Sequence, residues 1–89
     1  MHVTDILNRS SNANYEKVGD EAIVINLSTG AYYSLNDTGT IFWELIDGRR
    51  TIADCARQIA REYEVEASLV EDDLLELAAE FKQEGLVIV

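Results

Sequence analysis

The chain has 89 residues, with seventeen acidic against seven basic side chains and a formal net charge of −10 at pH 7. A chain this short buries a single core and cannot be a multidomain enzyme, while 47% hydrophobic and 27% charged residues are typical of a soluble globular domain. The negative field repels phosphate backbones and anionic lipids, so neither nucleic acid nor a membrane is an expected partner.

Residues 1–14 carry a short apolar patch and then a polar run, without a sustained helical or strand period. We therefore expect a flexible N-terminal arm over 1–14 and one folded domain over 15–89. Cys55 is the only cysteine, so no internal disulfide can form, and no segment has the length and apolarity of a signal peptide or a membrane span. A reducing cytoplasm is the expected location.

The pattern of strands begins after this arm. Residues 15–18 lead through a glycine turn into residues 22–27, which are rich in the β-branched side chains that a pleated surface favours. After a second turn at 28–30, residues 31–35 resume the two-residue alternation. These segments predict an antiparallel meander of three strands.

Three helices are predicted next, each from an i, i+4 apolar period behind a capping residue. The first begins at the capping candidates 36–38 and stops at Gly48. A Thr-x-x-Asp box at 51–54 opens the second helix, and a Ser-x-x-Glu box at 68–71 opens the third, whose apolar seam ends near Gly85.

The last residues, 86–89, suit a short closing strand or a hydrophobic tail against the core. Three strands followed by three helices predict an α+β fold in which the helices cover one face of the small sheet. Three short helices in succession also resemble a winged helix-turn-helix. A fold of this kind does not by itself assign a function.

Residues able to carry chemistry are few. The one histidine, His2, lies in the arm without a serine or cysteine at a recognisable spacing, and Cys55 falls on the apolar stripe of the second helix, where a thiol acts as a small hydrophobe. One cysteine and one histidine cannot complete a zinc site, and the acidic run 71–80 lacks the glycine of a calcium loop. We expect no enzymatic activity, no metal and no cofactor.

The third predicted helix has one acidic border. Four carboxylates flank its apolar seam on one side, at Asp72, Asp73, Glu76 and Glu80, while Lys82 lies on the opposite flank. A solvated helix face is the alternative explanation, but like charges this close repel one another by a few tenths of a kcal/mol per pair. That cost favours a cationic partner.

The third predicted strand, 31–35, is the more informative feature. In a sequential meander it is an outer strand, and it carries no proline, lysine or other charge that would protect a free row of N–H and C=O groups. Tyr32 and Tyr33 must point to opposite faces, so one of them is left for the surface. Proteins use such edges to bind extended peptides by strand addition.

Several short motifs occur together between residues 16 and 87. They are Glu21-Ala22-Ile23-Val24-Ile25-Asn26-Leu27 followed by Thr29-Gly30 and Tyr32-Tyr33, then Leu35-Asn36-Asp37-Thr38-Gly39, Asp47-Gly48-Arg49-Arg50-Thr51-Ile52, Tyr63-Glu64-Val65, and Leu77 to Gly85-Leu86. In this combination the chain resembles the PqqD-like proteins. These are the recognition elements for precursor peptides in pathways that make ribosomally synthesised, post-translationally modified peptide natural products.

The resemblance implies that a leader peptide adds as a further antiparallel strand to 31–35 and lies in the groove beside the third helix. It also implies a domain without chemistry of its own, which presents the peptide to a radical SAM enzyme, a leader peptidase of a lasso peptide pathway or a cyclase. The predicted peptide-binding residues are Ala31, Tyr32, Tyr33, Ser34 and Leu35 on the strand, with Leu69, Asp72, Asp73, Glu76, Leu77 and Glu80 on the helix.

Two other functions stay open on the sequence. A winged-helix DNA-binding regulator would bring the third helix to phosphates, which its carboxylates oppose. A phosphopantetheinyl carrier protein would display a serine at the start of an acidic helix, as Ser68 does, although an alanine precedes it and only one helix follows. A free strand edge also allows a homodimer by strand exchange.

Overall fold

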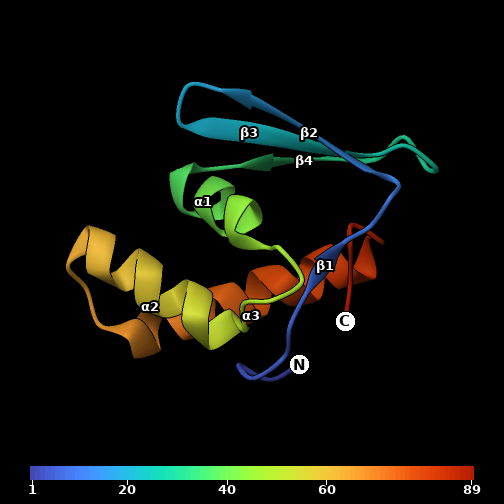
Figure 1. Ribbon diagram of the computed structural model, residues 1–89. Coiled ribbons are helices and arrows are strands. Elements are labelled where there is room, and N and C mark those ends of the chain that lie inside the picture. The colour runs from blue at the N-terminus through green and yellow to red at the C-terminus, as the bar shows by residue number, and fades with distance from the viewer.

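The computed structural model describes residues 1–89 as a small sheet with helices on one side (Figure 1). Strands β2 (Ala13–Val18), β3 (Glu21–Asn26) and β4 (Tyr32–Leu35) form an antiparallel sheet in sequential order. The predicted meander and the α+β class are confirmed, and β2 begins two residues earlier than the sequence indicates.

The helices all lie on the same side of this sheet, and no helix covers its other face (Figure 1). They are α1 (Asp37–Leu45), α2 (Ile52–Tyr63) and α3 (Ala67–Gln83). Helix α1 lies directly against the sheet, and α2 and α3 pack along one another beneath it. None of the helices combines the length and the hydropathy that crossing a bilayer requires.

The first two helices begin at the capping residues that the sequence predicts. The side chain of Asn36 accepts the Gly39 N–H at 2.9 Å at the start of α1. At the start of α2, Thr51 and Asp54 each accept the other's backbone N–H at 3.0 Å. These bonds satisfy donors that an uncapped helix leaves unpaired.

The predicted start of the third helix is wrong. The Ser-x-x-Glu box at 68–71 does not form, because α3 already begins at Ala67, with Glu66 at the cap position and no side-chain cap. Glu64 ends α2 in the left-handed conformation, with φ 55°. The connection to α3 is short, so α3 begins before the predicted capping serine. Ser68 thus lies inside the first turn, past the position from which a hydroxyl caps a helix.

The N-terminal segment also differs from the flexible arm predicted over residues 1–14. Strand β1 (Asn8–Arg9) pairs antiparallel with β5 (Val87–Ile88), and Leu7 is buried in the core. Four more backbone bonds hold the segment: Ala53 N–H to Val3 O at 2.8 Å, Ile52 N–H to Asp5 O at 3.0 Å, Gly48 N–H to Leu7 O at 3.1 Å and Ser10 N–H to Leu86 O at 2.9 Å. Backbone hydrogen bonds do not require a periodic pattern of apolar side chains, so hydrophobic periodicity in the sequence does not reveal them.

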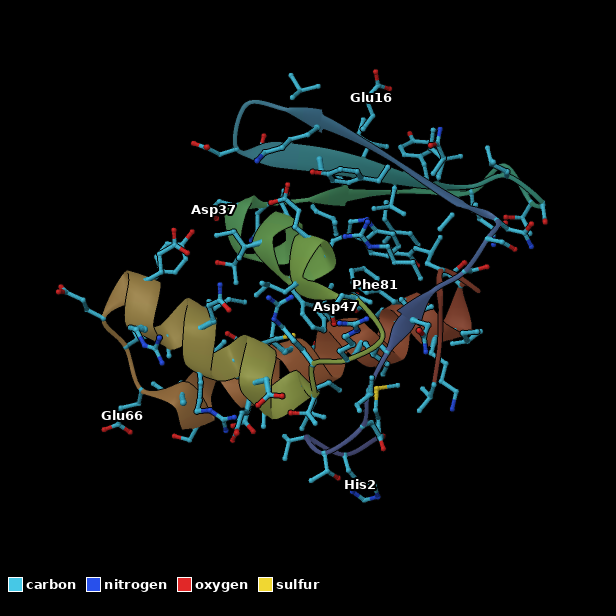
Figure 2. The ribbon with its side chains drawn as sticks, in the orientation of Figure 1. His2, Glu16, Asp37, Asp47, Glu66 and Phe81 are labelled. Carbon is cyan, nitrogen blue, oxygen red and sulfur yellow. The ribbon has the colours of Figure 1, made fainter.

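The core lies between the sheet and the helices and is centred on three aromatic residues. Phe81 of α3 stacks on Phe42 at 6.0 Å between ring centroids and meets Trp43 edge-on at 5.5 Å. Figure 2 shows Phe81 in the interior between α1 and α3. Such pairs add about 0.5–1.5 kcal/mol each beyond the area they bury, and they hold α3 at a set distance below α1.

A buried asparagine joins the β3–β4 turn to the end of α3. The Asn26 side chain accepts the N–H groups of Ser28 at 2.9 Å and Thr29 at 3.3 Å. Its amide donates to the Glu84 carbonyl at 2.7 Å. A Cβ at Gly85, where φ is +72°, would lie only 3.2 Å from that amide nitrogen, so glycine gives the amide its room.

Replacing Asn26 should destabilise the domain. We expect Asn26→Ala to lower the free energy of unfolding by about 1–3 kcal/mol, because the part-buried Glu84 carbonyl loses its donor and the N–H groups of Ser28 and Thr29 lose their acceptor. Urea unfolding followed by circular dichroism measures the change. Asn14→Ala is the matched control, since Asn14 is exposed on β2, and it should change stability by less than about 0.5 kcal/mol. Equal effects of the two substitutions would contradict this role.

Candidate functional site

Strand β4 is an outer strand, and no other strand of the chain pairs with its far side. The Asn26 N–H donates to the Ala31 carbonyl at 2.8 Å. In an antiparallel pair every second residue bonds to the partner strand, so Ala31, Tyr33 and Leu35 direct their backbone groups to β3. The N–H and C=O groups of Tyr32 and Ser34 therefore point to the free side.

The other outer strand, β2, is protected where β4 is not. Glu16 and Lys17 place charges in β2, and Figure 2 shows Glu16 pointing away from the helices. Strand β4 has neither a charged residue nor a proline. Charged side chains at an edge discourage pairing with another chain, so of the two edges β4 is the one open to an added strand.

A groove of about 440 Å³ lies beside the last two residues of β4, on the helical side of the sheet. Its walls come from β4 with the start of α1 on one side and from α3 on the other. Its lining consists of Ser34, Leu35, Asn36, Thr38, Gly39, Asp73, Leu74, Glu76, Leu77 and Glu80. The floor is apolar because Leu35 and Leu74 belong to the buried core and Leu77 packs against it.

The structure brings six of the eleven predicted peptide-binding residues together in this groove. They are Ser34, Leu35, Asp73, Glu76, Leu77 and Glu80. Of the others, Ala31 and Tyr33 bond to β3, Tyr32 points to the opposite face, and Leu69 and Asp72 are exposed on α3 outside the groove. The sequence prediction omits the start of α1, although the Leu-Asn-x-Thr-Gly motif at 35–39 marks that place.

Tyr32 and Tyr33 point to opposite faces, as strand alternation predicts. Tyr32 is 68% exposed, whereas Tyr33 packs against the core on the helical side. Partial burial and then the nearby carboxylates of Glu84 and Glu80 raise the pKa of Tyr33. The phenol therefore stays protonated and remains a hydrogen-bond donor at this end of the site.

Carboxylates line the α3 wall of the groove, and no basic side chain of the protein neutralises them. Asp73, Glu76 and Glu80 are exposed and take part in no ion pair. The three ion pairs of the chain join Lys17 to Glu44, Arg50 to Asp47 and Arg57 to Asp54. With a rise of 1.5 Å per residue, the groove carboxylates span about 10 Å of α3. The groove is therefore negative along its length.

The histidine and the cysteine lie away from the groove. His2 is exposed near the N-terminus, far from the sheet (Figure 2). Cys55 is 2% exposed in α2, and burial raises the pKa of its thiol to about 11. No cluster of three or more His, Cys, Asp or Glu side chains is arranged to hold a metal ion.

A family model described as Coenzyme PQQ synthesis protein D (PqqD) matches residues 21–87. Among solved structures, TbiB1 in complex with the TbiA(beta) leader peptide is similar, with a TM-score of 0.82, 25% identity, and coverage of 90% of this chain and 93% of that one. Lasso peptide synthetase B1 complexed with the leader peptide has a TM-score of 0.83, 22% identity, and coverage of 96% and 100%. No curated protein matches the sequence significantly.

The buried thiol should be unreactive in the folded protein. At pH 8 a pKa of about 11 leaves roughly 0.1% of Cys55 as thiolate, against roughly a quarter of an exposed thiol. We expect iodoacetamide to alkylate Cys55 at least about a hundredfold more slowly in buffer than in urea, measured by intact mass. Cys55→Ala is the control that should gain no mass. Equal rates in buffer and urea would contradict the burial.

Proposed function

The chain belongs to the PqqD family, and we propose that it binds the leader region of a ribosomally synthesised precursor peptide and presents it to a separate modifying enzyme. Both structural neighbours are complexes with a leader peptide, which supports this function. The observation that carries the proposal is the groove that lies beside an unprotected strand edge.

The peptide adds to β4 as a further antiparallel strand. Tyr32 and Ser34 offer it four backbone groups, and a net hydrogen bond contributes about 0.5–1.5 kcal/mol, so the backbone supplies about 2–6 kcal/mol. A micromolar dissociation constant requires about 8 kcal/mol after the cost of ordering the peptide. Side chains that enter the groove must supply the remainder, and they also supply the selectivity.

The groove walls are held in place before the peptide arrives. Phe81 fixes α3 against α1, and Asn26 bonds the β3–β4 turn to the last turn of α3. A site built on a packed helix and a paired strand loses little conformational entropy on binding. The ordering cost therefore falls on the peptide.

The domain contributes binding and presentation, and the chemical steps belong to its partner, a radical SAM enzyme, a leader peptidase or a cyclase. The two other functions considered from the sequence have no support here. The exposed face of α3 carries carboxylates, which oppose DNA phosphates, and both structural neighbours hold a peptide. For the carrier function the structure adds no support: Ser68 lies in the first turn of α3, and α3 is the last helix of the chain.

The strand edge can be tested with a proline. The Ser34 N–H points outward, so Ser34→Pro removes a donor from the free edge and leaves the β3–β4 bonds intact. The probe is a synthetic peptide selected from a displayed library of random peptides against this protein. We expect Ser34→Pro to weaken its binding about tenfold in fluorescence anisotropy, because the lost N–H leaves a carbonyl of the added strand unpaired. An unpaired group costs about 1–3 kcal/mol, and a tenfold change corresponds to about 1.4 kcal/mol.

Ser34→Ala is the control for this variant, because it keeps the N–H and should bind within about twofold of the original chain. Circular dichroism should show both variants folded. Normal peptide binding by a folded Ser34→Pro variant would contradict strand addition at β4.

The groove floor can be tested at Leu77. Leu77→Glu places a charge on the apolar floor, and we expect it to weaken the same peptide about tenfold while the domain stays folded, since Leu77 is only half-buried. Val65→Glu is the matched control, because Val65 is 49% exposed in the α2–α3 connection outside the groove. Equal losses of affinity in the two variants would show that charge alone, and not the groove, determines binding.

A further inference from the structure

The register of β4 determines which side chains of an added strand enter the groove. Tyr33 and Leu35 direct their side chains to the helical side, whereas Tyr32 and Ser34 are exposed on the other face. Residues directly opposite one another in an antiparallel pair share a face of the sheet. Peptide residues opposite Tyr33 and Leu35 therefore point to the helical side, toward α3, and the residue between them does not.

The two positions that face the helices meet different surroundings. Opposite Leu35 the side chain reaches the apolar floor made with Leu74 and Leu77. Opposite Tyr33 it reaches the phenol and the end of α3, where Glu80 lines the groove and Glu84 is held beside the start of β4 by the Asn26 bond. Both positions thus lie beside carboxylates of α3, but only the position opposite Leu35 also meets an apolar floor.

These contacts also give the direction of the peptide. The start of β4 lies by the end of α3, because Asn26 bonds both Ala31 and Glu84, while Leu35 at the end of β4 lies by Leu74. Strand β4 is therefore antiparallel to α3. A peptide antiparallel to β4 runs parallel to α3, so it passes Leu35 first and Tyr33 second on the way to its own C-terminus.

The spacing of the two positions fits the helix wall. Two residues of an extended strand advance by about 6.7 Å. Along the axis of α3, Glu80 lies about 4.5 Å beyond Leu77 and Glu84 lies about 10.5 Å beyond it. One strand repeat from an apolar anchor therefore places the next such side chain between the two carboxylates when measured from Leu77, and about 2 Å before Glu80 when measured from Leu74.

We propose that the leader peptide bound by this chain carries a large apolar residue followed, two positions toward its C-terminus, by lysine or arginine. This inference rests on the proposed function and names the class of peptide that the groove selects. The aliphatic stem of such a residue packs on the helical side of Tyr33, and its charged head reaches Glu80 and Glu84 at the solvent border. An acidic residue there would meet two like charges and no cation of this protein.

The test uses a displayed library of random twelve-residue peptides selected against the full chain. We expect the bound peptides to be enriched in an apolar residue two positions before lysine or arginine. For a synthetic peptide of this pattern, changing the basic residue to glutamine should weaken binding about fivefold, the upper end of the range for an exposed ion pair, because two carboxylates face the one cation.

A double-mutant cycle assigns that loss to the carboxylates. The same peptide change should cost less than about twofold when the protein carries Glu80→Gln and Glu84→Gln together. The matched control carries Glu71→Gln and Asp72→Gln, which remove the same charge from α3 outside the groove. In this control the fivefold cost of the peptide change should persist.

The outcomes separate this inference from the function on which it rests. Peptides that bind, and that lose affinity to Ser34→Pro, but show no basic residue at this position overturn the inference and leave strand addition standing. A glutamine cost that persists in the Glu80 and Glu84 variant also overturns it. A library that yields no peptide sensitive to Ser34→Pro overturns the proposed function itself.

Discussion

The separation between α3 and the edge strand β4 is the constraint on which the site depends, and two contacts set it. Phe81 is fully buried against Phe42 and Trp43, which fixes the height of α3 below the sheet. Asn26 bonds the Glu84 carbonyl and so fixes the end of α3 to the turn before β4. Because neither contact involves the free side of β4, the core can be tightly packed while one row of backbone groups stays available.

The carboxylates of this acidic chain fall into two groups, those with hydrogen-bond partners in the protein and those without. The backbone N–H groups of Arg50 and Arg49 lower the pKa of Asp47. The backbone N–H of Thr51 is the main cause that lowers the pKa of Asp54. These two carboxylates therefore stabilise local turns of the chain. The carboxylates of the groove have no such partners. The net charge of −10 therefore has a structural part and a part left for association, which the residue count alone does not distinguish.

Local patterns predicted the parts of the fold that local chemistry determines. Strand alternation and capping residues indicated the meander and the starts of α1 and α2, and the absence of charge in 31–35 indicated the open edge. The N-terminal pairing was missed because β1 and β5 are held by backbone bonds between distant segments. Helical periodicity placed Leu69 and Asp72 on the right helix, but only tertiary packing decides where along α3 the groove begins.

The pairing of β1 with β5 brings the two chain ends into a small sheet of their own, separate from the one that contains β4. The N-terminus lies far from the β4 edge, as the place of His2 shows (Figure 2), whereas the C-terminus follows Glu84 by only five residues. Fusion to a reporter, or coupling to a sensor surface, through the N-terminus should therefore leave the recognition face unobstructed. The same arrangement lets the domain be linked covalently to an enzyme, where a short linker raises the local concentration of the captured substrate.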